Sequence, residues 1–206
     1  MQEQIITHLS QDPLLASIIP HITFPDYGAN NNDVYFGLLE SIASQQLSVK
    51  AADTIFKRFL ALFPGEYPKP ELLVETPQET LRGVGLSNQK AQYMRNVAAF
   101  FIEHQLFDKD WSSYSDAEVI QLLSSIKGVG KWTVEMILMF VLRRPDVFPI
   151  DDLGVRQAMI RLYKVELEGK AQYQRLTEIA EAWRPYRTYA CRYLWRWKDN
   201  PPITGG

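Results

Sequence analysis

The chain has 206 residues, of which 46% are hydrophobic and 22% charged, and this ordinary balance excludes wholesale disorder. Its one cysteine, Cys191, excludes an internal disulfide, a four-cysteine zinc site and an iron–sulfur cluster. The formal net charge of −2, taken alone, argues against a nucleic-acid partner, because nucleic-acid-binding domains are often strongly basic. We see neither a signal peptide nor an apolar run long enough to cross a membrane, so we expect a cytoplasmic protein.

Helical periodicity dominates the first half of the chain. Apolar residues recur at three- and four-residue spacing over 33–46 and over 51–63, which predicts two helices followed by a loop rich in proline and glycine. The run Thr76-Pro77-Gln78-Glu79 has the pattern of a capping box with proline at the first helical position. A third helix is therefore predicted to start there and to end at Gly83-Val84-Gly85.

The second half continues in the same way. Ser87 predicts another helix start, and Ser115 to Glu118 form a second capping box. The segment from Lys131 to about Leu142 is apolar on nearly every side, which is typical of a helix buried in the middle of a domain. Further helices are predicted to start near residues 153, 171 and 185. Without strand alternation or repeats, the pattern predicts an all-α protein of about ten helices.

Two glycines one residue apart, in Lys127-Gly128-Val129-Gly130, lie between two predicted helices. Glycine permits a tight turn with positive φ and the close approach of another backbone. The following helix N-terminus favours an anion through its N–H groups and its dipole. A phosphate would fit there, with Lys127 and Lys131 as counter-charges. The alternative is an ordinary turn between two helices.

Two acids, Asp151 and Asp152, lie between a proline loop and the predicted helix start near Leu153. One of them is expected to cap this helix, which stabilises it by about 1 kcal/mol. Capping does not require two acids, so the other is expected to project into a cleft as a carboxylate favoured by the helix N-terminus. Asp152 follows Trp132 by 20 residues, a length that allows the acid to return close to the glycine turn.

A glycine hairpin, a buried helix, a proline loop and an aspartate in this order resemble the helix–hairpin–helix DNA glycosylase superfamily. Two segments resemble its 3-methyladenine DNA glycosylase II (AlkA-type) branch, namely Ala182-Trp183-Arg184-Pro185-Tyr186-Arg187 and Ser44-Gln45-Gln46-Leu47-Ser48. The likeness extends from about Asp12 to about Lys198. The extra N-terminal domain of longer members is not seen, so we expect a short form.

The resemblance implies two packed helical lobes with an active-site cleft between them. The central lobe would span about 33–145, and the terminal lobe about 1–32 with 146–200. The implied function is a monofunctional DNA glycosylase of base excision repair that hydrolyses the N-glycosidic bond of flipped-out alkylated purines such as 3-methyladenine. We expect damaged double-stranded DNA as the partner, a monomer, no membrane role, and association with the nucleoid when the protein acts on DNA.

The resemblance also implies roles for single residues. Asp152 matches the essential aspartate of the family, and Asp151 is then a neighbour with a capping or loop-ordering role. Bifunctional relatives such as endonuclease III have a Schiff-base lysine at the position of Trp132. Lys131 is one residue early and would point away from that face, so we expect no strand-cleaving lyase activity.

The flipped base would bind a pocket for which Trp132 and Trp195 match family positions, with Tyr35 as a third aromatic candidate. An aromatic face attracts a cation, such as an alkylated purine, by about 0.5–2 kcal/mol. At two other pocket positions where the family has aromatic residues, this chain has Met136 and Leu153. The pocket is therefore expected to offer fewer aromatic faces.

Contacts with the duplex are implied on both sides of the lesion. Gln46, with Leu47 behind it, matches the plug that fills the gap in the duplex, and Leu86 resembles a wedge on the opposite strand. The alternatives are an exposed helix end for Gln46 and packing against its own helix for Leu86. The hairpin residues expected to bind DNA are Lys127, Gly128, Val129, Gly130 and Lys131. No cofactor is expected to be required, although the resemblance implies an Na⁺ or K⁺ ion at the backbone carbonyls of Ser124, Ile126 and Val129.

A basic run near the C-terminus reconciles the net charge with DNA binding. No acid lies among its members, which are Arg184, Arg187, Arg192, Arg196 and Lys198. A cationic face can therefore exist on a slightly acidic protein. The competing interpretations are a non-catalytic helix–hairpin–helix DNA-binding module, a bifunctional glycosylase/lyase, and a helical protein without a nucleic-acid role.

Overall fold

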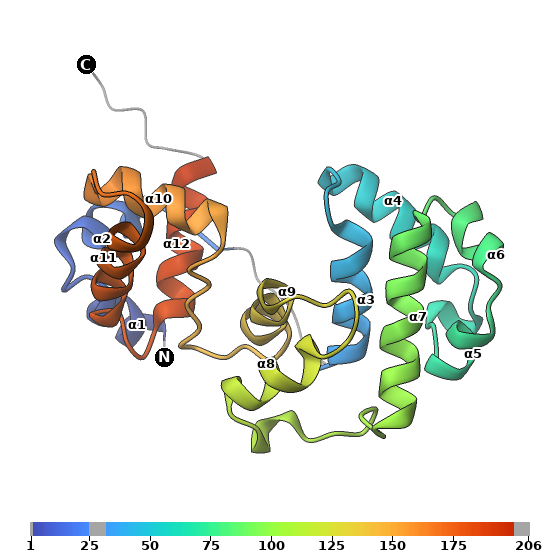
Figure 1. The fold of residues 1–206 in the computed structure, drawn as a ribbon. Helices are drawn as coiled ribbons and strands as arrows, with labels where there is room; N and C mark the ends of the chain where they lie inside the picture. Colours follow the sequence, from blue (N-terminus) through green and yellow to red (C-terminus); the bar gives the residue numbers. More distant parts are fainter. Residues whose placement is uncertain (1, 25–31, 200–206) are drawn as a thin grey trace. The chain divides into compact units, whose positions relative to one another are not determined.

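The computed structural model describes residues 2–24 and 32–199, and within these ranges it holds twelve α-helices and no strands (Figure 1). The all-α prediction is confirmed. The chain divides into two compact units, which we call the terminal unit (Met1–Asn30 with Arg143–Gly206) and the central unit (Asn31–Leu142). The lobe boundaries expected from the sequence, at 33 and 145, lie close to these divisions. None of the described helices is long and apolar enough to span a lipid bilayer.

The terminal unit is built around its last helix. Its helices are α1 (Gln2–Leu9), α2 (Pro13–Ile18), α10 (Leu153–Tyr163), α11 (Gly169–Glu181) and α12 (Arg187–Asp199). Helix α12 packs against α10 and α2, and α11 packs against α10. Asp12 joins these elements, because its Oδ1 accepts hydrogen bonds from the first amides of α2 while its Oδ2 accepts one from the Tyr163 hydroxyl and one from the Trp183 indole.

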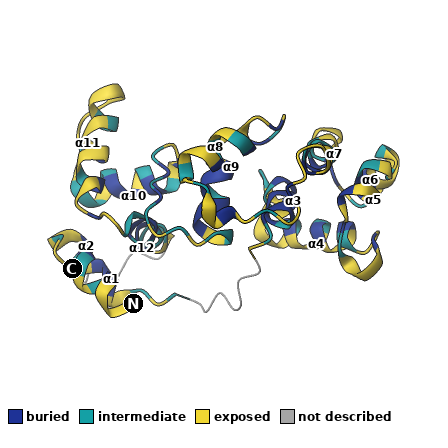
Figure 2. Ribbon diagram, turned by 90° about the horizontal axis from the view of Figure 1, so that it is seen from below, coloured by how far each residue is buried: buried dark blue, intermediate teal, exposed yellow. Residues whose placement is uncertain are grey.

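The central unit is built around two of its helices, which pack against each other and against most of the rest. Its helices are α3 (Val34–Ser44), α4 (Val49–Leu60), α5 (Pro70–Glu75), α6 (Gln78–Gly83), α7 (Asn88–Glu103), α8 (Asp116–Ser124) and α9 (Lys131–Met136), followed by a π-helical turn (Ile137–Val141). Helix α7 packs against α3, α5 and α6, and α3 also packs against α4 and α9. The side chains of Leu38, Leu39 and Ile42 are fully buried, and the buried face of α3 is visible in Figure 2.

The two predicted capping boxes have different outcomes. Ser115 and Glu118 form the reciprocal pair of hydrogen bonds that defines a capping box at the start of α8, as predicted. The prediction at Thr76 is wrong, because its hydroxyl donates to the Leu72 carbonyl and Thr76 ends the short helix α5. Helix α6 begins after Pro77, which offers no side-chain hydrogen bond.

The buried helix predicted from Lys131 to Leu142 is present, but its second half is a π-helix. The wider turn packs closely on α3 at Gly37, where a Cβ atom would lie 2.7 Å from Val141 and 3.1 Å from Ile137. A glycine at this point therefore admits the broader helix. Single π-helical turns are often found near functional sites.

Candidate active site

The Asp152 carboxylate is held at the N-terminus of α10. Its Oδ1 accepts a hydrogen bond of 2.8 Å from the Val155 amide, which caps the helix, and one of 2.7 Å from the Trp195 indole Nε1. The side chain is almost completely buried, with 9% exposed. Both donors are N–H groups, so this oxygen acts as the acceptor in both hydrogen bonds.

The capping role expected for Asp151 is wrong, because Asp152 itself is the N-cap of α10 and Asp151 is exposed. The capping role thus belongs to the acid that the sequence analysis expected to project into a cleft. The hydrogen bond from the Val155 amide fixes the direction of this carboxylate.

Gly154 lies against the candidate site and was missed by the sequence analysis. A Cβ atom at this position would lie 2.9 Å from the Trp195 ring and 3.1 Å from Asp152 Oδ1. The absence of a side chain therefore lets the indole reach the carboxylate across the first turn of α10. The available signal was the glycine itself, because glycine in a helix costs about 1 kcal/mol relative to alanine.

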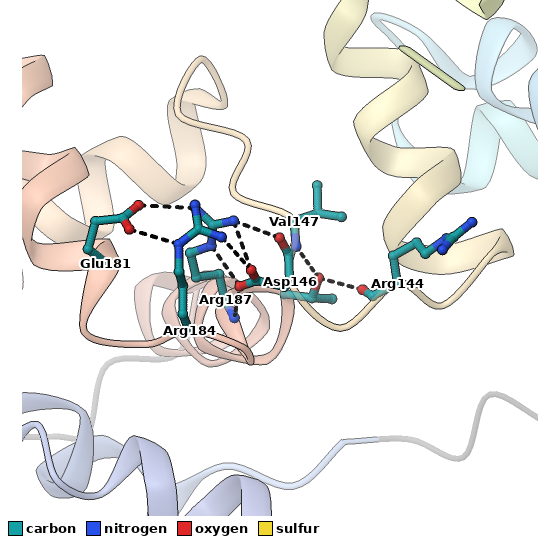
Figure 3. A network of polar contacts seen from close by, with 7 residues as sticks. Arg144, Asp146, Val147, Glu181, Arg184 and Arg187 are labelled. Atoms are coloured by element: carbon teal, nitrogen blue, oxygen red, sulfur yellow. Dashed lines mark hydrogen bonds and ion pairs between the residues drawn. The ribbon is translucent and has the colours of Figure 1, made fainter. Parts of the chain in front are cut away.

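Ion pairs hold the loop that leads to Asp152 (Figure 3). Arg187 donates from Nε to Asp146 Oδ1 at 2.7 Å and from Nη2 to the Asp146 carbonyl at 2.9 Å. Arg184 donates to Asp146 Oδ2 at 2.7 Å, and Glu181 pairs with both arginines. The basic charges of Arg184 and Arg187 are thus offset by acids, contrary to the expectation that they contribute to an open cationic face.

The start of α12 also holds this loop through Thr188. Its hydroxyl accepts a hydrogen bond from the Val147 amide and donates one to the Arg144 carbonyl. Two turns further along α12, Trp195 contacts the acid at the end of the loop. A single helix therefore fixes the loop at its beginning and at Asp152.

The central unit brings Trp132 and Gln46 together. Trp132 is 41% exposed, and its ring lines a hollow of about 320 Å³ together with Gln46 and with Ser41, Ser44 and Gln45 of the α3 end. Gln46 and Trp132 are 86 positions apart in the sequence. Trp132 was expected to face the flipped base, and Gln46 to fill the gap that the base leaves. The arrangement provides an aromatic face beside a polar side chain.

A neighbouring groove of about 460 Å³ continues this surface. It is lined by Met136, one helical turn after Trp132, and by the half-exposed Leu47. Glu40 lies at the same groove, and burial raises the pKa of its carboxyl. In the terminal unit, Leu153 is 56% exposed beside Asp152, and Trp195 is half-buried.

Two expected site residues belong to the core. Tyr35 is 2% exposed, packs in tilted contacts among aromatic rings and donates its hydroxyl to the Pro68 carbonyl at 2.7 Å, so we assign it to packing and leave it out of the base pocket. Leu86 is 4% exposed, which agrees with the packing alternative and offers no side chain to a duplex in this conformation. Gln46 is exposed at its turn.

The fold requires one of the two hairpin glycines but not the other. Gly128 has φ of +107°, and a Cβ atom there would lie 2.2 Å from the Tyr93 ring, so the fold itself needs this glycine. Gly130 is exposed, and a Cβ atom there would meet nothing within 4 Å. The turn is closed by a hydrogen bond of 3.0 Å from the Val129 amide to the Ile126 carbonyl.

The two hairpin lysines lie on either side of this turn. Lys127 is exposed, and its carbonyl accepts a hydrogen bond from Asn96. Lys131 lies 3.4 Å from Glu135 in an ion pair along α9.

The sequence pattern of the HhH-GPD superfamily of base excision DNA repair proteins matches residues 39–185, a range that contains the Gln46 turn, the hairpin and Asp152. The chain belongs to this superfamily. The chain is similar to a putative DNA-3-methyladenine glycosylase of Bacillus subtilis (strain 168), 32% identical over 94% of this chain and 68% of the relative. DNA-3-methyladenine glycosylase 1 of Schizosaccharomyces pombe is 35% identical over 84% of this chain and 75% of the relative.

A solved structure supports the same placement. The 3-methyladenine DNA glycosylase of the fission yeast, in complex with abasic DNA, superposes with a TM-score of 0.81 at 31% identity. The match covers 98% of this chain and 100% of the other.

Proposed function

We propose that this chain is a monofunctional DNA glycosylase of base excision repair that hydrolyses the N-glycosidic bond of alkylated purines such as 3-methyladenine. The observation that carries the proposal is the Asp152 carboxylate, oriented by the Val155 amide and the Trp195 indole in a member of this superfamily. The relatives named as DNA-3-methyladenine glycosylases support the choice of substrate class. The damaged duplex is the proposed partner.

The chemistry follows from the charge that develops as the base leaves. The enzyme takes the base out of the stack to reach its glycosidic bond. The sugar then becomes positively charged, and an oriented carboxylate stabilises that charge and directs water to it. Electrostatic complementarity of this kind is often worth about 3–4 kcal/mol.

The tryptophan at position 132 supports hydrolysis over lyase chemistry. Trp132 stands where bifunctional relatives carry the Schiff-base lysine, and it lines the hollow with Gln46. Lys131, the adjacent amine, is paired with Glu135 along α9. An alkylated purine is cationic and a better leaving group, so it needs no covalent amine intermediate and is attracted by the Trp132 face.

The hairpin is proposed to hold one DNA strand. The exposed Gly130 precedes α9 and leaves room for a phosphate to approach the first amides of the helix. Lys127 and Lys131 supply positive charge on either side. The carbonyls of Ser124, Ile126 and Val129 are neutral oxygen donors on one turn, a donor set that suits a monovalent cation such as Na⁺ or K⁺.

Two properties of the whole protein are part of the proposal. We propose a monomer, since a single chain supplies both the carboxylate and the aromatic hollow. We also propose a cytoplasmic enzyme that associates with the nucleoid while it acts on DNA.

The decisive experiment replaces Asp152 with asparagine. We expect Asp152→Asn to lower single-turnover release of 3-methyladenine from methylated duplex DNA by about 100–1,000-fold, because the oriented negative charge is lost. Binding to a duplex with a stable abasic analogue should stay within about threefold of wild type, since no contact with the duplex is removed. Asp151→Asn, at the exposed neighbour, is the matched control and should remain near wild-type activity.

The outcomes separate the competing functions. Base release by Asp152→Asn at the wild-type rate would contradict the assignment of the carboxylate. A wild-type protein that binds DNA but releases no base from alkylated duplexes is a non-catalytic module. A covalent protein–DNA adduct trapped with borohydride identifies a glycosylase/lyase instead.

A further inference from the structure

Lys90 makes two hydrogen bonds to the end of α3. Its Nζ donates to the Ala43 carbonyl at 2.8 Å and to the Gln45 carbonyl at 2.7 Å, although the lysine lies in the first turn of α7, more than 40 residues later. The last carbonyls of a helix lack partners within the helix. Lys90 therefore supplies donors to backbone groups that the end of α3 leaves without helical partners.

These carbonyls belong to the turn that carries Gln46. The Leu47 amide donates to the Ser44 carbonyl at 3.2 Å, Gln45 has φ −50° and ψ 132°, and Gln46 has φ 58°. This is the geometry of a type II turn, whose third position requires positive φ and favours glycine. A glutamine there is strained, and such strain persists only where the surroundings hold it.

The lysine is itself firmly placed. Helix α7 is capped by Ser87, whose side chain accepts a hydrogen bond from the Lys90 amide. The side chain of Gln78 donates to the Asn88 carbonyl at 2.9 Å and also holds this helix end. The side chain is partly buried, and burial lowers the pKa of its amine. The ammonium thus points at the α3 turn from a fixed helix end and is partly withdrawn from solvent.

We propose that Lys90 is a positioning residue that holds Gln46 in its left-handed conformation, ready to fill the gap left by a flipped base. The inference rests on the proposed function, because a plug is useful only to a protein that flips a base. The lysine would act through the turn and not through a phosphate, since its ammonium is directed at two backbone carbonyls. Without it, the turn is free to relax and Gln46 loses its fixed direction.

The test is a double-mutant cycle between Lys90 and Gln46. Lys90→Met keeps the aliphatic stem and removes the donors, and we expect it to lower single-turnover excision from duplex DNA about tenfold, in line with the loss of charged hydrogen bonds. Gln46→Ala should cause a similar loss. Adding Lys90→Met to Gln46→Ala should cost less than about twofold more, because the lysine acts through the glutamine.

A binding readout keeps this test separate from catalysis. Fluorescence of 2-aminopurine beside a stable abasic analogue reports opening of the stack without any bond cleavage. We expect a weaker signal with Lys90→Met and a wild-type signal with Lys90→Arg, which retains donors and charge. Lys57→Met removes an exposed lysine of α4 by the same substitution and should leave both readouts unchanged.

Each result decides one point. Wild-type excision by Lys90→Met, or losses that add in the double variant, would overturn the inference. A salt dependence of DNA binding that corresponds to about one fewer released counterion in Lys90→Met would also overturn it, because that result marks a direct contact between Lys90 and a phosphate. Lys90→Gln replaces the methionine variant if melting shows that the latter is unfolded. If wild-type protein releases no base, the proposed function fails, and the fluorescence signal still decides the role of Lys90.

Discussion

At the scale of single residues, Asp152 receives hydrogen bonds from the first turn of α10 and from an indole on α12. A carboxylate held from two elements has little rotational freedom, so its direction is set before any ligand binds. Trp195 was expected only as an aromatic face of the pocket. Its Nε1 contact gives it a second role, because the same ring orients the acid.

The hydrogen bond from Trp195 can be removed without removing the ring. We expect Trp195→Phe to reduce base excision by about tenfold, since hydrogen bonds to charged groups contribute about 1.5–3 kcal/mol. Affinity for a duplex with an abasic analogue should change little, and single-turnover kinetics with binding titrations separate the two. Trp197→Phe, the same change in the same helix, is the control. Equal losses in both variants would assign the effect to helix packing.

Sequence analysis identifies Asp152 through motif order, yet it misses what holds the group in place. Trp195 and Asp152 are 43 positions apart, and Lys90 and Ala43 are 47 apart. Neither contact leaves a local pattern, because tertiary packing alone brings the partners together. Capping preference, which is local, could not decide between Asp151 and Asp152, since either acid fits the position before α10.

At the scale of elements, the hairpin between α8 and α9 contains two glycines, and the physical reason for a glycine differs between the two positions. Gly128 is required by positive φ and by the Tyr93 ring against it. Gly130 has φ −90° and ψ 164°, a conformation open to any residue, and empty space around its Cβ position. The fold does not explain a glycine there, whereas the close approach of a phosphate backbone under the proposed function would.

The two alanine variants of this hairpin should therefore behave in opposite ways. We expect Gly128→Ala to lower the free energy of unfolding by at least about 2 kcal/mol, through overpacking and backbone strain, as measured by urea denaturation. Gly130→Ala should keep wild-type stability and weaken DNA binding several-fold in a fluorescence titration. Unchanged DNA affinity in Gly130→Ala would count against the phosphate site.

Local helix signals succeed or fail according to what competes with them. Ser115 caps α8 as predicted, because the 3₁₀ turn Trp111–Ser113 before it already ends at Tyr114 and the Ser115 hydroxyl accepts from the Glu118 amide. Thr76 fails because the short α5, whose six residues are too few for clear periodicity, ends at that position and takes its hydroxyl. The π-helical turn after Met136 has no sequence signal of its own, since it depends on the space that Gly37 leaves on α3.

At the scale of the whole molecule, the net charge of −2 conceals how the basic residues are used. In the basic run near the C-terminus, Arg184 and Arg187 pair with Asp146 and Glu181. Arg192 lies over the rings of Phe24 and Tyr189. Three of the five basic residues in the run therefore help to hold the terminal unit together. Under the proposed function, backbone amides at the hairpin would then carry a larger share of phosphate recognition than a count of charges implies.

The central unit contains a buried tyrosine and the terminal unit a partly buried one, and folding raises the pKa of both. Burial raises the pKa of Tyr35 in the central unit, whose hydroxyl donates to the Pro68 carbonyl. Burial, followed by the hydrogen bond to Asp12, raises the pKa of Tyr163 in the terminal unit. A pKa raised by folding contributes stability that is complete below the unfolded value, about 10 for tyrosine, and that is lost as pH rises above it.

We therefore expect the free energy of unfolding to fall steeply above about pH 10, measured by urea denaturation in steps from pH 7 to pH 11. Tyr35→Phe and Tyr163→Phe should each flatten this alkaline fall, because the ionising group is gone. At pH 7 each variant should be less stable by about 1–3 kcal/mol, since the Pro68 carbonyl or the Asp12 carboxylate loses its donor. If the free energy of unfolding falls above pH 10 as steeply in both variants as in wild type, other groups cause the loss of stability.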